Sequence, residues 1–236
     1  MAENHFGEDV AANYDRTDGA FATEVVGATV GFLADLAGNG AALELGIGTG
    51  RIALPLAQRG IPVHGIDLSE AMVDRLRAKP GGDATPVAIG DFATTAVDGT
   101  FSLVYLVFNT IMNLTTQDAQ VACFENASAH LEPGGCFVIE VGIANGSHLQ
   151  VFALGDVHVG IDEWEPATQR LVSHHFWLLD GRWMRDSIPF RAASPGELDL
   201  MARMAGLRLR ERWSGWAREP FTAESRSHVS VWEKAG

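Results

Sequence analysis

Residues 43–57, LELGIGTGRIALPLA, run from a short apolar segment through three glycines into a helical pattern. Gly46, Gly48 and Gly50 form GxGxG, and Arg51 stands where the longer GxGxxG fingerprint has its third glycine. Glycine lets the chain leave a strand sharply and lets backbone N–H groups approach a ligand closely. By itself the pattern fits either a ligand-binding loop or a purely structural turn.

Three acidic residues stand near the ends of successive strand-like segments. Glu44 is predicted to be the last outward-facing residue before the glycines, where a carboxylate repels a pyrophosphate and attracts a cation. Asp67 follows Gly46 by 21 residues, where a carboxylate can accept hydrogen bonds from both ribose hydroxyls, and Asp91 can accept one from an adenine amine. Alone, Asp67 also fits a helix N-cap and Asp91 a solvated turn. Together the acids favour a ligand, because open α/β sheets bind ligands at these strand ends.

Short apolar segments alternate with helical patterns over the first 140 residues. Such segments predict an α/β fold with a parallel sheet covered on both faces, and right-handed crossovers make it doubly wound. The predicted architecture is a Rossmann-like, mostly parallel seven-stranded sheet. Its strands are expected at 41–45, 61–66, 85–89, 101–107 and 136–141, and its helices at 19–37, 51–59, 69–78 and 117–131.

The pattern changes after residue 141. Residues 142–190 contain tryptophans, β-branched residues and an Asp-Gly turn, which predict an antiparallel β cap inserted after the fifth strand. A capped helix is expected at 194–207 and a last strand at 227–234. We therefore predict one domain, 1–236, with four parts. These are an N-terminal lid with helices (1–38), a cofactor-binding core (39–141), a substrate cap (142–190), and the last helix and strands (191–236).

The composition excludes several classes of function. The net charge of −13 disfavours binding to nucleic acid or to an anionic membrane, and no apolar run approaches a membrane span. The N-terminal MAENHFGEDV lacks the basic start of an export signal, so a cytoplasmic location is predicted. Cys123 and Cys136, both in apolar segments, are expected to be buried free thiols.

Four stretches in order, LELGIGTG, VHGIDLSEAM, GDF and LEPGGCFVIEV, resemble the class I S-adenosylmethionine-dependent methyltransferases over about residues 10–141. The resemblance implies S-adenosyl-L-methionine as cofactor and S-adenosyl-L-homocysteine as product. It places the ribose diol on Asp67 and the adenine amine on Asp91. A nicotinamide enzyme of similar fold is disfavoured by Glu44 and Arg51. The resemblance implies these cofactor-binding residues: Tyr14, Glu44, Gly46, Gly48, Gly50, Asp67, Leu68, Met72, Asp91, Phe92 and Phe108.

The N-terminal ANYDR is similar to the small-molecule branch of this family, which includes sugar-amine and lincosamide N-methyltransferases of antibiotic biosynthesis. The resemblance places Tyr14 beside the transferring methyl, in a lid of residues 5–18. Tyr14 is therefore the predicted catalytic residue, acting by orienting the reacting groups. A tyrosine that merely packs an amphipathic lid is the alternative. Where the macrolide sugar enzymes carry a histidine, this chain has Asn113, so a histidine-assisted mechanism is not expected.

The acceptor is expected to be a small molecule, most simply an amine of a natural-product scaffold, because an amine needs no strong base. Methyl transfer to a hydroxyl or carboxylate is the alternative. His174 and His175 are adjacent in a predicted strand, so at most one faces the site. No metal, nucleic-acid or membrane partner is expected. A homo-oligomer is possible, and the sequence does not decide the oligomeric state. The residues predicted to bind the acceptor are Phe6, Asn109, Asn113 and His175.

Overall fold

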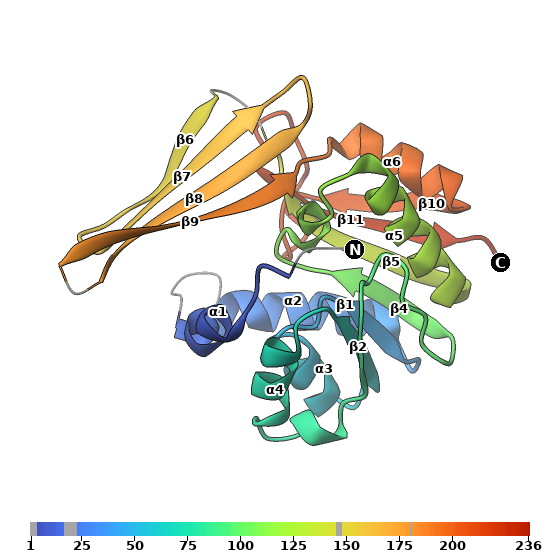
Figure 1. Ribbon diagram of the computed structural model, residues 1–236. Coiled ribbons are helices and arrows are strands. Elements are labelled where there is room, and N and C mark those ends of the chain that lie inside the picture. Colours follow the sequence, from blue (N-terminus) through green and yellow to red (C-terminus); the bar gives the residue numbers. More distant parts are fainter. Residues whose placement is uncertain (1–3, 17–22, 145–147, 180) are drawn as a thin grey trace.

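The computed structural model describes residues 4–16, 23–144, 148–179 and 181–236. Its large sheet has seven strands in the order β10-β11-β5-β4-β1-β2-β3 (Figure 1). Strands β1 to β5 run parallel, β11 is antiparallel to β5, and β10 is antiparallel to β11. This confirms the predicted doubly wound, mostly parallel sheet. Its strands are β1 (Ala42–Leu45), β2 (Val63–Asp67), β3 (Val87–Ile89), β4 (Phe101–Leu106), β5 (Leu131–Gly142), β10 (Leu207–Trp213) and β11 (Ser227–Lys234).

Helices cover both faces of the sheet, and three of them begin at a hydroxyl N-cap. Ser69, Thr116 and Ser194 accept hydrogen bonds from backbone N–H groups of the first turns of α4, α5 and α6. Of the predicted helix at 19–37, residues 19–22 lie outside the described residues. The helices are α1 (Glu8–Asn13), α2 (Thr23–Ala37), α3 (Ala53–Gln58), α4 (Glu70–Arg77), α5 (Gln117–His130) and α6 (Pro195–Met204), with 3₁₀ turns η1 (Tyr14–Arg16), η2 (Gly82–Ala84) and η3 (Thr110–Asn113).

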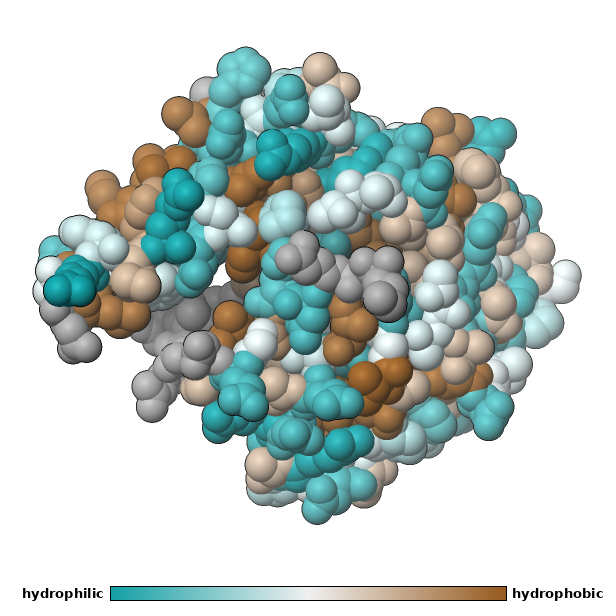
Figure 2. Space-filling view, in the orientation of Figure 1, coloured by the Kyte–Doolittle hydropathy of each residue, from teal (hydrophilic) through white to brown (hydrophobic). Residues whose placement is uncertain are grey.

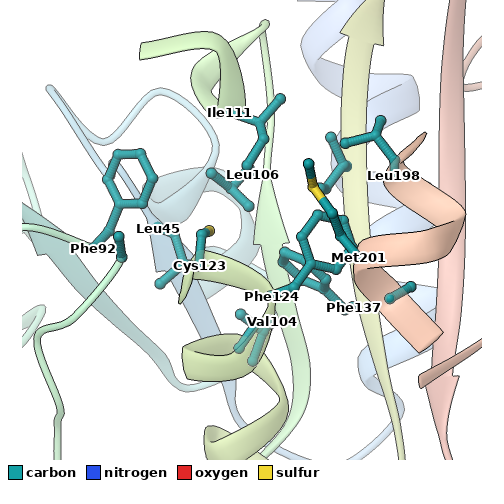
Figure 3. Close-up of a cluster of buried hydrophobic side chains, with 14 of the residues drawn as sticks. Leu45, Phe92, Val104, Leu106, Ile111, Cys123, Phe124, Phe137, Leu198 and Met201 are labelled. Carbon is teal, nitrogen blue, oxygen red and sulfur yellow. The ribbon is translucent and has the colours of Figure 1, made fainter. Parts of the chain in front are cut away.

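The core lies on the two sides of this sheet. On one side α5 and α6 pack against β4, β5 and β11, and the rings of Phe124 and Phe137 meet edge to face at 5.0 Å (Figure 3). On the other side α2 and α3 pack through Leu33 and Leu56, which are fully buried. Both cysteines are buried free thiols, as predicted. The core therefore fixes the carboxyl ends of β1, β2 and β4 relative to one another.

The cap is a separate four-stranded antiparallel sheet that projects from the body (Figure 1). Trp164, Leu171 and Phe190, at the base of the cap, pack against the core. The buried guanidinium of Arg191 forms an ion pair of 2.6 Å with Glu197 of α6 and so holds the end of the cap against the body. The strands, in order across the sheet, are β6 (Leu149–Leu154), β7 (His158–Glu165), β8 (Arg170–Leu179) and β9 (Arg182–Arg191).

One strand boundary differs from the sequence prediction by more than two residues, and one strand of the large sheet was not predicted separately. β5 begins at Leu131 rather than at 136, because the LEPGG segment already pairs with β4 across a register shift. β10, LRLRERW, had no predicted range of its own. Its alternation of leucine with charged residues is the period-two signal of an edge strand.

Candidate active site

The glycine loop joins β1 to α3 at the carboxyl edge of the sheet. All three glycines have positive φ, at 75°, 55° and 77° along the chain. A Cβ on Gly50 would lie 2.9 Å from Leu76 Cγ, so this glycine is required by packing. A Cβ on Gly48 would lie 3.4 Å from Met72 Cε and 4.0 Å from the Gly46 carbonyl oxygen, which are ordinary contact distances. Gly48 therefore adjoins space that the described protein leaves open, as a ligand-binding loop requires.

Asp67, the last residue of β2, is held by the backbone on two sides. The Gly48 N–H donates to its Oδ2 at 2.7 Å, and the Ser69 N–H donates to its Oδ1 at 2.8 Å. Burial raises the pKa of this carboxyl above its usual range, against these hydrogen bonds. The N-cap alternative for Asp67 is wrong, because Ser69 caps α4 by accepting from Met72 N–H at 3.2 Å. The carboxylate instead ties the glycine loop to β2 and keeps lone pairs for a ligand.

Glu44 was predicted to be an outward-facing carboxylate, but its side chain is buried. It is the second-to-last residue of β1 and only 3% exposed, and the Tyr105 hydroxyl donates to its Oε2 at 2.9 Å. Burial raises its pKa to about 8, so the isolated carboxylate is poorly stabilised. The physical reason is that β1 is an interior strand, between β4 and β2, where side chains of either face are covered. A cationic ligand group beside Glu44 would favour its charged form.

Asp91 and Phe92 follow β3. The Asp91 carboxylate accepts from Ala93 N–H at 2.9 Å, and Asn126 Nδ2 donates to the Phe92 carbonyl at 2.9 Å. Phe92 is 9% exposed and joins the hydrophobic cluster drawn in Figure 3. Asn126 of α5 therefore holds the loop that follows β3 in place. The contacts of both residues with an adenine stay predictions, as do those of Leu68 and Met72.

The segment after β4 carries backbone strain. Phe108 and Asn109 are consecutive non-glycine residues with φ of 57° and 62°, a conformation that persists only where surrounding contacts impose it. Glu140 of β5 imposes it, since its carboxylate accepts from Phe108 N–H at 2.8 Å. Asn109 Oδ1 accepts from Gly142 N–H at 2.7 Å, and Asn113 Nδ2 donates to the Thr110 carbonyl at 3.2 Å.

Both asparagines named for acceptor binding therefore already take part in holding this segment. For Asn109 the engaged atom is the amide oxygen, and for Asn113 it is the amide nitrogen. Any contact that they make with an acceptor would use their other amide atom. The assignment of both residues to acceptor binding stays a prediction.

The N-terminal segment lies against the glycine loop and the start of α4. Asp15 accepts from Thr49 Oγ1 at 2.7 Å and pairs with Lys79 Nζ at 2.8 Å. Burial opposes ionisation of Asp15, but the hydrogen bonds from Lys79 and Thr49 hold its pKa below the usual value. Near the N-terminus, Ser69 Oγ donates to the Phe6 carbonyl at 2.5 Å. Sequence reasoning missed Thr49 and Lys79, because their role depends on a contact between distant segments.

Tyr14 sits inside this docked segment. Its ring meets that of Phe6 edge to face, with centroids 6.2 Å apart. Burial raises the pKa of its phenol, Arg51 opposes the shift, and the nearby carboxylates of Asp67, Asp15 and Glu44 add to it. Tyr14 is thus close to the acidic residues of the site and remains protonated at neutral pH.

Arg51 is a third residue that the sequence did not assign to the site. It follows the last loop glycine, and its guanidinium lies over the Phe108 ring at 4.8 Å from the centroid. It is also close enough to Tyr14 and Glu44 to influence their pKa values. The carboxyl edge of the sheet therefore presents one guanidinium beside several carboxylates, a set of groups that suits a ligand with both charges.

The two faces of the cap are chemically different. Successive strand residues point to opposite faces, so register defines an inner face, with Trp164, Leu171 and Phe190 at its base, and an outer face, with His174 and Phe176. The inner face is continuous with the core residues of η3 that follow β4, because its base packs against the same cluster.

His175 lies on the inner face, within a row of aromatic rings. Its Nδ1 is 3.1 Å from His158 Nε2, and the His158 ring stacks on Trp177 with centroids 3.7 Å apart. Burial lowers the pKa of both imidazoles. His174 lies on the outer face and bonds to Ser187 and Glu163. Among the described residues, no group of three metal-ligating side chains comes together.

Comparison with known proteins identifies the family. A methyltransferase domain model matches residues 42–135. The cypemycin N-terminal methyltransferase of a Streptomyces species is 31% identical over 203 residues, which cover 81% of this chain and 82% of that protein. The chain belongs to the class I S-adenosylmethionine-dependent methyltransferases.

Solved structures agree with this assignment. The CcbJ methyltransferase from Streptomyces caelestis is 37% identical, with a TM-score of 0.88 and full coverage of both chains. CalS10 from Micromonospora echinaspora, an amino pentose methyltransferase with S-adenosylmethionine bound, shares the fold at 21% identity and a TM-score of 0.72 over both full chains. The cofactor of this methyltransferase is S-adenosyl-L-methionine.

The residues of the site fit this cofactor. The space beside Gly48 admits a ligand against the loop backbone. The pKa of buried Glu44 is raised even though Arg51 opposes the shift, and a sulfonium compound bearing an ammonium group can supply a further positive charge that favours the carboxylate. No helix of the described residues is long and apolar enough to cross a membrane.

Proposed function

We propose that this methyltransferase methylates an amine nitrogen of a small natural-product scaffold of the antibiotic type. The observation that carries the proposal is the half-buried Tyr14, whose phenol has a raised pKa and lies near the carboxylates of Asp67, Asp15 and Glu44. A phenol with a raised pKa is a poor base at neutral pH. The site therefore suits an amine acceptor, whose neutral form has a nucleophilic lone pair without help from a strong base. The name of a relative, the cypemycin N-terminal methyltransferase, supports the same choice.

The cofactor half of the site is assigned as follows. The ribose hydroxyls donate to Asp67, whose backbone donors leave lone pairs on both oxygens. The adenine amine donates to Asp91, and the ring lies between Leu68, Met72 and Phe92. The methionine part lies over Gly46, Gly48 and Gly50, with its ammonium toward Glu44 and its carboxylate toward Arg51. Phe108 borders this methionine part.

When bound, the sulfonium cofactor would supply an activated methyl group. The amine lone pair would attack the methyl carbon in line, and a C–N bond would form as the C–S bond breaks. S-adenosyl-L-homocysteine would leave, and the methylated ammonium would lose its proton to water. The residues of this chain provide position rather than reactivity. Aligned reactants gain several kcal/mol, up to about 7–11 in well-oriented systems. Tyr14 orients the reacting groups through its hydroxyl. The lid excludes water by closing over the glycine loop through Asp15 and over the start of α4 through Phe6.

The acceptor lies between the lid, the segment after β4 and the inner face of the cap. Phe6 supplies an aromatic wall from the lid. Asn109 and Asn113 contribute the amide atoms that the fold does not use. His175 and its stacked neighbours offer flat, uncharged rings to a ring-bearing scaffold, because their lowered pKa values keep them neutral near pH 7.

Methyl transfer to a hydroxyl or carboxylate is the second candidate, and one observation favours it. On the inner face Ser173 Oγ donates to Asp162 at 2.7 Å and lies 3.5 Å from His175 Nε2. A carboxylate, a hydroxyl and an imidazole in series are the components of a base, which an aliphatic hydroxyl would need.

The deciding experiment supplies methyl-labelled S-adenosyl-L-methionine and pairs of scaffolds that differ only in an amine or a hydroxyl at one position. We expect label on the amine members alone, with fragmentation mass spectrometry placing it on nitrogen. Label on oxygen that disappears in His175→Gln would establish the second candidate instead. Absence of transfer to every member, with normal cofactor binding, would contradict the small-molecule acceptor.

A further inference from the structure

Glu140 places a carboxylate in the apolar run CFVIEV of β5. Ile139 and Val141 belong to the cluster under α5 and α6, whereas Val138 belongs to the cluster on the other side of the sheet. Because side chains alternate along a strand, Glu140 lies on the same side as Val138. A carboxylate in an apolar strand needs a hydrogen-bond partner, and Glu140 finds its partner in the segment that follows β4.

Two residues of that segment are held by Glu140 in the left-handed conformation. Its carboxylate accepts from Phe108 N–H at 2.8 Å, and its backbone carbonyl accepts from Asn109 N–H at 3.2 Å. Asparagine adopts positive φ more readily than most residues, whereas for a bulky residue such as Phe108, with φ of 57°, this conformation is an outlier. The carboxylate of Glu140 therefore bonds to the backbone of the more strained residue.

The strain keeps an aromatic ring at the surface. The Phe108 side chain is 43% exposed, although burial would stabilise an apolar ring, and the Arg51 guanidinium lies 4.8 Å from the ring centroid. The molecule is hollowed between the cap and the body (Figure 2), and β5 leads into the cap at this end of the sheet (Figure 1). A strained backbone that keeps an apolar ring accessible is typical of a preorganised binding group.

We propose that Glu140 is a positioning residue for the methionine part of the cofactor. Its carboxylate fixes the Phe108 backbone, the Phe108 ring fixes the guanidinium of Arg51, and this guanidinium receives the cofactor carboxylate. The inference rests on the cofactor assignment of the proposed function, and it does not depend on the identity of the methyl acceptor. If Glu140 only stabilised the fold, its loss would weaken every ligand of the site equally.

The test compares two ligands of the cofactor site by isothermal titration. S-adenosyl-L-homocysteine carries an amino-acid part with the same carboxylate and ammonium as the cofactor, whereas adenosine consists of the adenine and ribose alone. Glu140→Leu removes the acceptor oxygen and should raise the dissociation constant of S-adenosyl-L-homocysteine about 10- to 100-fold, the range for a lost hydrogen bond to a charged group. The constant for adenosine should change less than about threefold, because adenosine lacks the part that Phe108 and Arg51 contact. An equal rise for both ligands, or no rise for S-adenosyl-L-homocysteine, would overturn the proposal.

Three further variants control for charge and folding. Glu140→Gln keeps an acceptor oxygen and should stay within about threefold of the wild type for both ligands. Glu140→Asp keeps the charge but is one methylene shorter, so it should show the same selective loss even if Glu140→Leu fails to fold. Glu233→Leu removes a carboxylate of the neighbouring strand β11 that pairs with Arg210 at the surface, and it should change neither constant. Selective loss in Glu233→Leu, or none in Glu140→Asp, would contradict the positioning role.

A double-mutant cycle tests whether Glu140 acts through Phe108. Phe108→Gly removes the ring and relieves the strain of positive φ, so it should weaken S-adenosyl-L-homocysteine as Glu140→Leu does. Adding Glu140→Leu to Phe108→Gly should then cost less than about twofold more. Additive losses would show that Glu140 does not act through Phe108. Unchanged affinity in Phe108→Gly would contradict the cofactor assignment itself, and the positioning role with it.

Discussion

The carboxyl edge of the large sheet and the inner face of the cap both gather acidic and aromatic side chains, but they hold them differently. At the sheet edge the backbone fixes the carboxylates, as with the N–H groups of Gly48 and Ser69 on Asp67. On the cap, side chains hold one another, as with His158 and His175. Backbone-fixed groups are preorganised for one ligand, whereas groups held by side chains can change with the acceptor. The following variants test whether the sheet edge binds the cofactor while the lid and the cap bind the acceptor.

The largest effect is expected for Gly48→Val. The added branches enter the space beside the loop, so cofactor affinity should fall more than about 100-fold, a loss of about 3 kcal/mol or more. Gly38→Val is the matched control, because Gly38 has φ of 57° against 55° for Gly48 and also has room for a Cβ. Isothermal titration measures both. Equal losses of affinity would mean that backbone strain, not cofactor space, is responsible.

Deletion of residues 1–18 removes the predicted lid, of which residues 17–18 lie outside the described residues, together with its Asp15 and Phe6 contacts. Turnover should fall more than about 100-fold, because water enters and the reactants lose alignment. The fold should survive, since the core of the sheet lies elsewhere. Initial rates and circular dichroism check both statements. Near-full turnover would move the acceptor site entirely to the cap.

Asp67→Ala removes two ribose hydrogen bonds in our assignment. Cofactor affinity should weaken by about 1.5–3 kcal/mol, the range for hydrogen bonds to a charged group. Because Asp67 also ties Gly48 to β2, the comparison includes Asp67→Asn, which keeps an acceptor oxygen. Titration of 2′-deoxyribose analogues against each variant separates ribose contact from loop support. An analogue penalty that persists in Asp67→Ala would contradict the ribose role.

Tyr14→Phe removes one orienting hydroxyl while preserving the ring that meets Phe6. Turnover should fall about 10- to 100-fold with little change in the KM for the acceptor. If Tyr14 acted as a base, the loss of turnover in Tyr14→Phe would depend on pH. The pH profile of kcat for the wild type and the variant therefore provides the check. A profile unchanged in shape supports orientation, whereas loss of an alkaline limb would indicate proton abstraction.

The smallest expected effect concerns Glu44 and the stability of the cofactor-free protein. Its folded pKa of about 8 lies above the ordinary 4.5, so between these values the folded state binds more protons than the unfolded state. Stability should therefore fall as pH rises from about 5 to 8, and Glu44→Gln should reduce that fall by about 1–2 kcal/mol. Urea unfolding at several pH values measures it. Parallel curves for wild type and variant would show that Glu44 is not the titrating group.

Much of the cofactor half could be predicted from the sequence because its signals are local. A glycine pattern after an apolar segment, and acids at fixed distances beyond it, specify the loop and the strand ends within about 50 residues. The burial of Glu44 agrees with the predicted covering of both faces of the sheet, and it was the reading of Glu44 as outward-facing that was wrong. The partner of Glu44 was not predictable in this way, because the Tyr105 hydroxyl comes from a strand 61 residues further along the chain.

The sequence by itself determined the sheet, its cofactor edge and the presence of an antiparallel cap, since periodicity and turn residues act over a few neighbours. Only the tertiary structure decided which residues 30 or more apart meet, as Asp15 meets Thr49 and Lys79. It also decided that His174 and His175 separate into two cap faces with different neighbours. The alternation of side chains along a strand means that adjacent residues point to opposite faces of the sheet. The packing of the cap base against the core decides which of the two side chains faces inward.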